Sequence, residues 1–454
     1  MARSAVRDLT EGSPMKLVLG FATPLLFGFI FQQLYNIVDT AIVGQFLGAN
    51  ALAAVGSTGS INFLILGFCM GICSGFSIPI AQSFGAKEES DMRCFVMNSA
   101  YLSGAFGIVL AIVTGLLCPA MLRWMNTPAE IVDDAVSYIQ IIFFGIPATM
   151  LYNMTGGILR ALGDSKTPVY FLVVASLVNI VLDLVLILVI PMGVAGAAIA
   201  TVVSQIASGV GCLIVIKKRF PILHCSPEER KFRALHAKKL TNIGIPMGLQ
   251  YSITAIGSVV VQVAVNGLGT IAVAAVSTAG RLNNFFCCVF DALATTMATF
   301  AGQNIGARKI RRIDEGLKAA TILGIIYCII ALAVIYFFSR AMIGLFVSSS
   351  DANAAAVTDL AREYLLINGA FFIPLLFVNI VRLSIQGMGY TQIAVCAGIC
   401  EMIARTLVGW LLVPIWGYTA ACFASPVAWL AADAFLFPCY FRITRRLRKR
   451  MGEA

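Results

Sequence analysis

Two aspartates lie within long apolar runs of the sequence, where an ionisable side chain is costly. Asp183 lies in the run Phe171–Ile190, with Asn179 four residues before it, and Asp39 lies near the end of the first such run. A spacing of four places Asn179 and Asp183 on one face of a helix. A charged side chain at the centre of a membrane-spanning helix costs about 2.5–3.5 kcal/mol on insertion scales. Both aspartates are therefore candidates for function, although Asp39 could instead cap its helix at the water interface.

Side chains that carry oxygen accompany both aspartates. Tyr35 and Asn36 precede Asp39 on neighbouring turns, and the apolar run after Asp183 contains Thr201 with Gln205 one turn later. Oxygen-rich clusters of this type can hold a proton or a dehydrated Na⁺. These residues predict a cation site.

Pro24 stands inside the first apolar run. A proline removes one backbone hydrogen bond and permits a kink in a helix. We expect Pro24 to act as a hinge that responds to protonation of Asp39.

The second half of the chain has different chemistry. Glu401 and Arg405 stand where the first half has Asn179 and Asp183, and an acid and a base four residues apart can neutralise each other. We interpret this pair as structural. Four further charges lie in apolar runs of this half, namely Arg281, Asp291, Arg382 and Asp433. Either aspartate could be a second titrating site or be neutralised by an arginine, and the sequence leaves both alternatives open.

The composition of the chain shows whether these residues lie in a membrane or in water. Of 454 residues, 59% are hydrophobic and 12% are charged, with a mean hydropathy of +0.90. A soluble domain carries about 25% charged residues. A membrane β-barrel would alternate apolar and polar residues over segments of about ten residues, whereas the runs here are continuous. We therefore predict an all-α integral membrane protein.

The sequence contains no pattern typical of a metal site, a disulfide framework or an enzyme active site. The 13 Cys are scattered, mostly within apolar runs, and there are only two His. No CxxC pair, HExxH motif, GxSxG motif or Walker A motif occurs. We expect no metal site, no cofactor other than a coupling ion, no enzymatic activity and no direct use of ATP.

Twelve apolar runs are long enough to span a bilayer. They cover residues 15–40, 51–80, 94–118, 131–158, 168–190, 194–216, 240–266, 271–301, 316–338, 360–386, 391–413 and 417–441. The longest polar stretch divides them equally. We therefore expect an N-terminal tail at 1–14, an N-lobe at 15–216, a basic linker at 217–239, a C-lobe at 240–441 and a basic tail at 442–454.

Loop charges predict the orientation. Basic residues gather at both ends and in the loops after spans two, four, six and eight, for example at Lys87, Lys166, Lys217–Arg219 and Arg308–Lys309. Cytoplasmic loops carry an excess of Lys and Arg, so both termini are expected in the cytoplasm. The net charge of +10 needs no nucleic acid to explain it.

The two halves are related by an internal repeat. Gly48–Val55 resembles Gly269–Val276, and Gln82–Lys87 resembles Gln303–Arg308 at the same spacing. Because six spans is an even number, the repeats are parallel. Two such lobes can rock about a cleft, which is typical of a carrier with alternating access.

We expect polar and aromatic residues of spans one, two, seven and eight to line a substrate cavity, although each alone could equally be a helix-packing residue. The candidates are Gln33, Tyr35, Asn36, Asn62, Gln250, Tyr251, Asn283 and Asn284.

These motifs together resemble the multidrug and toxic compound extrusion (MATE) family, in its bacterial DinF-like branch. The resemblance covers about residues 12 to 445. It is carried by Pro24, Gln32–Asp39, Gly85–Lys87, Gly302–Ala307 and Arg160–Pro168, where Ala161 and Ser165 depart mildly from the family signature.

The resemblance implies two six-helix lobes around a central cavity in the bacterial inner membrane. It also implies export of organic, often cationic, drugs driven by entry of H⁺ or Na⁺. The cation-coupling residues of the DinF-like branch fall on Asp39, Asn179, Asp183 and Thr201. Relatives of the NorM type carry acids in helices seven and ten, where this chain has Gln250 and no acid between Ile373 and Gly387. This departure favours coupling through the N-lobe.

An alternative within the same superfamily is a lipid-linked oligosaccharide flippase. Such a protein should present several cationic side chains to a pyrophosphate, and only Arg281 and Arg382 are obvious candidates here. We expect small organic substrates and membrane lipids as partners, no nucleic acid, and a monomeric chain.

Overall fold

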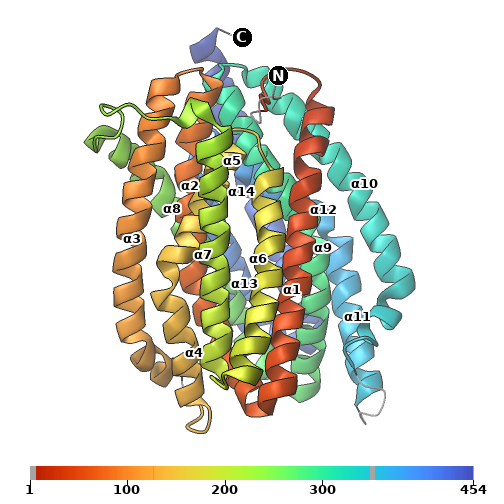
Figure 1. Ribbon diagram of the computed structural model, residues 1–454. Coiled ribbons are helices and arrows are strands. Elements are labelled where there is room, and N and C mark those ends of the chain that lie inside the picture. Colours follow the sequence, from red (N-terminus) through yellow and green to blue (C-terminus); the bar gives the residue numbers. More distant parts are fainter. Residues whose placement is uncertain (1–6, 126, 348–352, 453–454) are drawn as a thin grey trace. The chain divides into compact units, whose positions relative to one another are not determined.

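The computed structural model describes residues 7–125, 127–347 and 353–452, and this part of the chain is helical without strands (Figure 1). The helices of the first half are α1 (Pro14–Ser57), α2 (Gly59–Gly85), α3 (Glu89–Trp124), α4 (Val132–Phe144), α5 (Ile146–Ala161), α6 (Lys166–Leu184) and α7 (Val194–Arg219). Those of the second half are α8 (Ala234–Asn266), α9 (Thr270–Gly306), α10 (Ile310–Ile343), α11 (Ala354–Ala370), α12 (Phe372–Gly387), α13 (Thr391–Leu407) and α14 (Val413–Met451). Short π-helical segments, Val185–Val189 and Val408–Leu412, follow α6 and α13.

Several of these helices leave most of their apolar surface exposed. In the most apolar window of Lys166–Val189 only 28% of residues are buried, and in that of Ile310–Ile343 only 22%. Apolar side chains are exposed in this way where lipid is the solvent, because a helix satisfies its own backbone hydrogen bonds and needs no water. The chain is therefore an integral membrane protein.

The predicted twelve spans are confirmed. Within the described residues nine helical segments are long and apolar enough to cross a membrane. Two bent pairs each supply one more: α4 with α5, bent by 45°, and α11 with α12, bent by 52°. The segment Thr391–Met451 supplies two spans, because Gly417 interrupts its helical conformation.

The internal repeat is confirmed in the backbone itself. Four pairs of residues with positive φ recur at matching turns of the two halves: Gly48 and Gly269, Lys87 and Arg308, Gly163 and Gly389, and Gly193 and Gly417. The last pair has φ/ψ of 59°/−143° and 61°/−136°. This conformation is open almost only to glycine. Corresponding turns therefore share one backbone path.

Packing groups the chain into two compact units whose limits differ from those of the repeats. One unit contains residues 7–9 and Phe27–Ser252, and the other contains Thr10–Leu26 and the chain from Ile253 onward. The first part of α1 thus packs with the second half, where Lys309 Nζ donates to the Thr10 carbonyl at 3.0 Å. Each of α1 and α8 contributes to both units, and in α1 the change falls three residues after Pro24.

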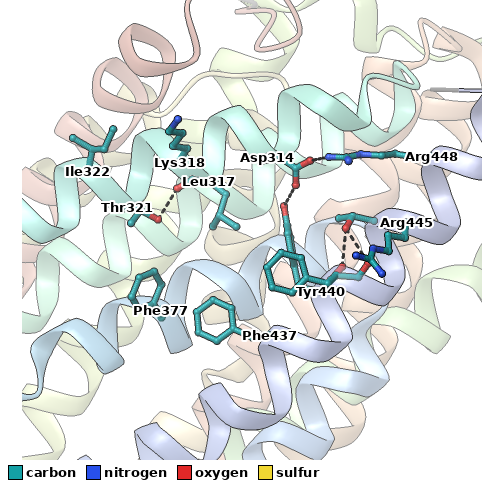
Figure 2. A pocket seen from close by; sticks show the side chains of 12 residues that line it. Asp314, Leu317, Lys318, Thr321, Ile322, Phe377, Phe437, Tyr440, Arg445 and Arg448 are labelled. Atoms are coloured by element: carbon teal, nitrogen blue, oxygen red, sulfur yellow. Dashed lines mark hydrogen bonds and ion pairs between the residues drawn. The ribbon is translucent and has the colours of Figure 1, made fainter. Parts of the chain in front are cut away.

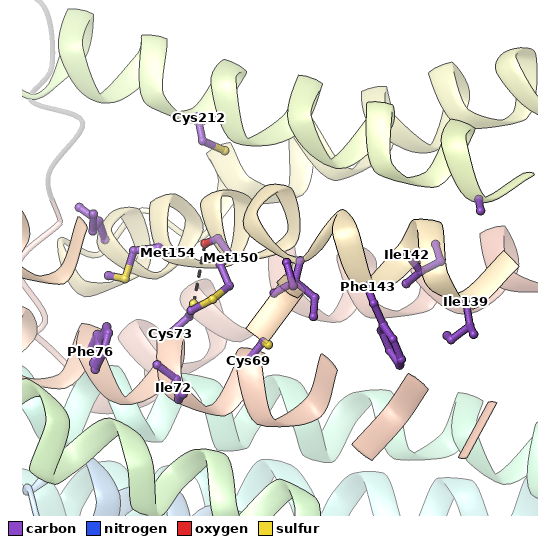
Figure 3. Close-up of a cluster of buried hydrophobic side chains, with 14 of the residues drawn as sticks. Cys69, Ile72, Cys73, Phe76, Ile139, Ile142, Phe143, Met150, Met154 and Cys212 are labelled. Atoms are coloured by element: carbon purple, nitrogen blue, oxygen red, sulfur yellow. Dashed lines mark hydrogen bonds between the residues drawn. The ribbon is translucent and has the colours of Figure 1, made fainter. Parts of the chain in front are cut away.

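The core of the first unit includes side chains of α2, α4 and α5 (Figure 3). Phe76 and Cys73 of α2 pack beside Met150 and Met154 of α5, and the Cys73 thiol donates to the Met150 carbonyl at 3.8 Å. Small and flexible side chains of this kind let two helices approach closely. The core supports the helices that carry the site described below.

The predicted linker is shorter than expected and is held against α3. Helix α7 continues to Arg219 and α8 begins at Ala234, so the irregular stretch covers only residues 220–233. The guanidinium group of Arg93 donates to Glu229 at 2.9 Å and to the Ile222 carbonyl at 3.2 Å. Asn98 accepts from the backbone of Arg233 at 2.9 Å. These contacts make the stretch an ordered cover on α3.

The pairing with Arg93 predicts a pH dependence of stability. Hydrogen bonds from Arg93 and from the Ser226 backbone lower the pKa of Glu229 to about 2. Because this pKa is depressed on folding, the stabilisation is complete above the unfolded-state pKa of about 4.3 and is lost as the pH falls toward 2. Glu229→Gln should cost about 1 kcal/mol at about pH 7.

Thermal unfolding in detergent of the native chain and of Glu229→Gln checks this prediction. The difference in Tm should narrow progressively below about pH 4. Glu228→Gln, which changes an exposed acid one residue away, is the control and should have little effect. A difference in Tm that does not change with pH would contradict the proposed role of the ionised carboxylate.

Candidate functional site

Three helices bring the predicted cation-coupling residues of the first unit together. Asn179 and Asp183 are fully buried on one face of α6. Thr201 approaches them from α7, and Asp39 from α1. Residues separated by more than 140 positions in sequence therefore form one polar cluster within an apolar helical unit.

Asn179 is the centre of this cluster. In the orientation that satisfies its amide, Nδ2 donates to the Tyr35 hydroxyl at 3.1 Å and to Asp183 Oδ2 at 2.9 Å. Its Oδ1 then accepts from the Thr201 backbone nitrogen at 3.0 Å. Since one amide contacts three helices, Asn179 fixes the position of Asp183 relative to α1 and α7.

The carboxyl groups of Asp39 and Asp183 face each other within hydrogen-bonding distance. Each retains one buried oxygen, Oδ1, without a hydrogen-bond donor among the described residues. Two like unit charges about 4 Å apart repel by about 4 kcal/mol where the effective dielectric constant is about 20. A proton shared between the carboxyls, or a cation bound to their oxygens, would remove this repulsion.

Two tyrosines complete the surroundings of the pair. Tyr35, predicted as a cavity residue, bonds Asn179 and Thr201 and so belongs to this cluster. Tyr138 of α4 is buried and lies close enough to interact electrostatically with both carboxyls. The sequence reading missed Tyr138, and its only signal was a hydroxyl group within an apolar run.

The other predicted cavity residues are distributed over both units. Gln33, Asn36 and Asn62 belong to the first unit, as do Gln250 and Tyr251 of α8. The remaining two, Asn283 and Asn284 of α9, belong to the second unit. Their shared role as a cavity lining stays a prediction.

The proposed hinge residue lies within regular helix. The only non-helical conformation within α1 is at Gly48, so the helix continues through Pro24. The role of Pro24 as a hinge also stays a prediction.

A second buried cluster of charges lies in the second unit. Glu401 of α13 forms an ion pair with Arg382 of α12, and its other oxygen lies 3.6 Å from Arg405. Asp433 of α14 lies near Arg382 and Glu401. All four side chains are at least nine-tenths buried. With two acids and two bases the cluster is neutral when all four are ionised, as a buried group of charges must be.

The two clusters occupy equivalent places in the repeat and differ in their side chains, with Glu401 in place of Asn179 and Arg405 in place of Asp183. Arg405 stands where the first half has Asp183, and a Cβ atom on Gly257 of α8 would lie 3.4 Å from its guanidinium group. The equivalent of Gly257 in α1 is Tyr35. The second unit thus has the positively charged Arg405 side chain where the first has Asp183, whose Oδ1 accepts no hydrogen bond from the described residues.

The other charges of the second half lie apart from this cluster. Arg281 and Asp291 of α9 are both exposed, and neither takes part in an ion pair among the described residues. The structure therefore does not bring Arg281 and Arg382 together in one cluster.

Comparison with known proteins identifies relatives along most of the chain. The sequence profile of the MatE family matches residues 24–185 and 246–411. The chain is 30% identical over 338 residues to the probable multidrug resistance protein YoeA of Bacillus subtilis, a match that covers 73% of each protein. It is 31% identical over 375 residues to the probable multidrug resistance protein YpnP of the same organism, covering 82% of each.

Solved structures share the fold. A crystal structure of MATE in complex with MaL6 superimposes with a TM-score of 0.91 at 22% identity, covering 99% of this chain and 100% of the other. The outward-facing conformation of a multidrug resistance MATE family transporter of the MOP superfamily superimposes with a TM-score of 0.90 at 22% identity. This match covers 97% of this chain and 98% of the other.

Proposed function

This chain belongs to the MATE family of transporters, and from that premise we propose that it exports small organic molecules, often cationic, by antiport against H⁺ or Na⁺. The export is proposed to run outward across the bacterial inner membrane, with both chain termini in the cytoplasm.

One observation carries the coupling part of the proposal, namely the facing carboxyls of Asp39 and Asp183. A site with two adjacent carboxyls binds a proton or a small cation strongly and is unfavourable when empty. Asn179 donates to Asp183 Oδ2 at 2.9 Å, and that oxygen can accept this bond whether the carboxyl is ionised or protonated at its other oxygen. A cation can thus be exchanged without unfolding the site.

Movement of α1 would couple this exchange to transport. Asp39 is on α1, whereas Asp183 is on α6. Loading the site draws the two helices together, and emptying it lets repulsion separate them. Pro24, close to the point where α1 passes from one packing unit to the other, is proposed to be the hinge for this movement.

The charge cluster of the second unit favours coupling through the first unit alone. Because Arg405 and Arg382 already neutralise Glu401, the charge cluster of the second unit needs no cation from solution. The same pairing weighs against the lipid-linked oligosaccharide flippase, since these guanidinium groups are engaged with Glu401 and are not presented to a pyrophosphate.

Transport by purified protein in proteoliposomes tests the proposal. A fluorescent cationic dye is enclosed, and a pH gradient or a Na⁺ gradient is imposed separately. Efflux that depends on one gradient and stops when that gradient is collapsed would support antiport and would identify the ion. Absence of dye movement under both gradients would count against multidrug export.

A further inference from the structure

A groove opens between α10, α12 and α14 of the second unit (Figure 2). It has a volume of about 680 Å³. Its residues are Asp314, Leu317, Lys318, Thr321, Ile322, Phe377, Phe437, Tyr440, Phe441, Thr444, Arg445 and Arg448. Tyr440 and Thr444 are buried, whereas Ile322 and Phe441 are exposed on the membrane-spanning helices, so the apolar part of the groove faces lipid.

One end of the groove is basic. Asp314 accepts from the Tyr440 hydroxyl at 2.7 Å and pairs with Arg448, so those two charges cancel. Lys318 and Arg445 are exposed, and no acid among the described residues pairs with either. Figure 2 shows Lys318 and Arg445 on different helices that border the groove. The groove therefore retains two positive charges.

The rest of the groove is apolar and aromatic. Phe377 and Phe437 pack edge to face, with ring centroids 5.3 Å apart. Phe441 is 57% exposed and Ile322 is 43% exposed. A surface that combines two cations with exposed aromatic and aliphatic groups is complementary to an amphiphile with an anionic head.

The repeat shows what covers the equivalent face of the first unit. Arg93, Asn98 and Tyr101 of α3 match Asp314, Ala319 and Ile322 of α10 by the spacing of the repeat. All three of these α3 side chains are bonded to residues 220–233 of the linker.

The cover in the first unit combines a carboxylate with apolar side chains. Glu229 places its carboxylate on Arg93, and Phe220 and Leu223 of the same stretch are buried. The second half has no such stretch among the described residues, because α14 continues as helix to Met451. The face on which the first unit holds the Glu229 carboxylate and apolar side chains of its own chain is open in the second.

We propose that this groove binds an anionic phospholipid, with the phosphate between Lys318 and Arg445 and an acyl chain along Phe377, Phe437 and Phe441. The lipid takes the place that residues 220–233 occupy on α3. Basic grooves between membrane helices at the basic, cytoplasmic end of a bundle are the usual form of such sites. The proposal rests on the membrane location of the chain and not on its export activity.

Lipid binding is tested on the full chain in detergent, without dye or gradient, so that its failure is distinguishable from failure of the transport proposal. Native mass spectrometry and thermal unfolding are measured with added phosphatidylglycerol, with phosphatidylcholine and with inorganic phosphate. We expect one retained phosphatidylglycerol per chain, a rise in Tm, and at least about tenfold weaker binding of phosphatidylcholine, the effect of about 1.4 kcal/mol.

Two matched double variants locate the site. Lys318→Gln with Arg445→Gln should abolish the preference for phosphatidylglycerol. Arg442→Gln with Lys449→Gln removes the same charge from exposed positions outside the groove and should preserve the preference. If both double variants lost the preference for phosphatidylglycerol equally, the proposal would be overturned, because lipid binding would then depend on the net charge of the protein and not on the groove.

Two further results would also overturn it. Inorganic phosphate that raises Tm as much as the lipid would indicate a small-anion site. A dimer that the Lys318 and Arg445 substitutions dissociate would make the groove an interface between copies of this chain.

Discussion

Asp183→Asn is expected to reduce gradient-driven dye efflux at least tenfold while leaving the protein as stable as, or more stable than, the native chain. The substituted amide cannot hold an exchangeable proton or contribute a negative charge to a cation. It also removes the need for a proton or cation to offset the repulsion from Asp39, which is about 4 kcal/mol for two free charges about 4 Å apart at an effective dielectric constant of about 20. A loss of only 1.4 kcal/mol from cation binding already corresponds to a factor of about ten.

The measurement pairs efflux from proteoliposomes with thermal unfolding of the same preparations. Asp291→Asn is the matched control, because Asp291 is a membrane-depth aspartate exposed on α9 and outside the cluster. It should retain efflux. Loss of efflux in Asp291→Asn with full activity in Asp183→Asn would place coupling in the second unit and refute the assignment.

Asp39→Asn should give the same loss of efflux as Asp183→Asn, and the double variant should lose no more than either single one. Two carboxyls that share one cation act as a unit, so their effects are not additive. Residual coupling in both single variants that disappears only in the double variant would instead indicate two independent sites.

Glu401→Gln is expected to be strongly destabilising, by about 3–5 kcal/mol, because it leaves two buried guanidinium groups with only Asp433 to balance them. Adding Arg405→Met should recover most of that loss. The double variant removes one charge of each sign and leaves Arg382 with Asp433, so the cluster is neutral again.

The free energy of unfolding is measured in one detergent for both variants and for Glu315→Gln as a control. Glu315→Gln breaks an exposed ion pair in which Arg311 and Glu315 lie 3.8 Å apart. That control should cost less than about 1 kcal/mol. If the double variant is less stable than Glu401→Gln alone, then Arg405 contributes packing against Gly257 that charge balance does not describe. Efflux of the rescued variant should equal that of the native chain if coupling is confined to the first unit.

The duplicated halves thus use one architecture for two purposes. In the first unit the equivalent helix position carries an acid that lies close to a second acid, and we propose that a mobile cation balances them. In the second unit a guanidinium group is built in, and Gly257 makes room for it. One half is suited to exchange an ion and the other to remain fixed, which is consistent with a cycle driven by one coupling site.

Local features of the sequence were sufficient to predict the membrane class, the twelve spans and the repeat. Apolar length and helical periodicity depend only on neighbouring residues, and a bilayer enforces both because each span must satisfy its own backbone. The shared face of Asn179 and Asp183 followed from their spacing of four for the same reason. The matching turns at Gly48 and Gly269 followed from the repeat of Gly48–Val55 in Gly269–Val276.

Contacts between distant segments were decided only by the tertiary structure. Nothing in the sequence pairs Arg382 with Glu401, brings Tyr138 to the two carboxyls, or holds residues 220–233 against α3. Hydropathy likewise cannot show that α1 and α8 each pack with both units. Which side chains meet depends on the rotation and offset of packed helices, and these are determined by the combined packing of many side chains, a property that no local spacing contains.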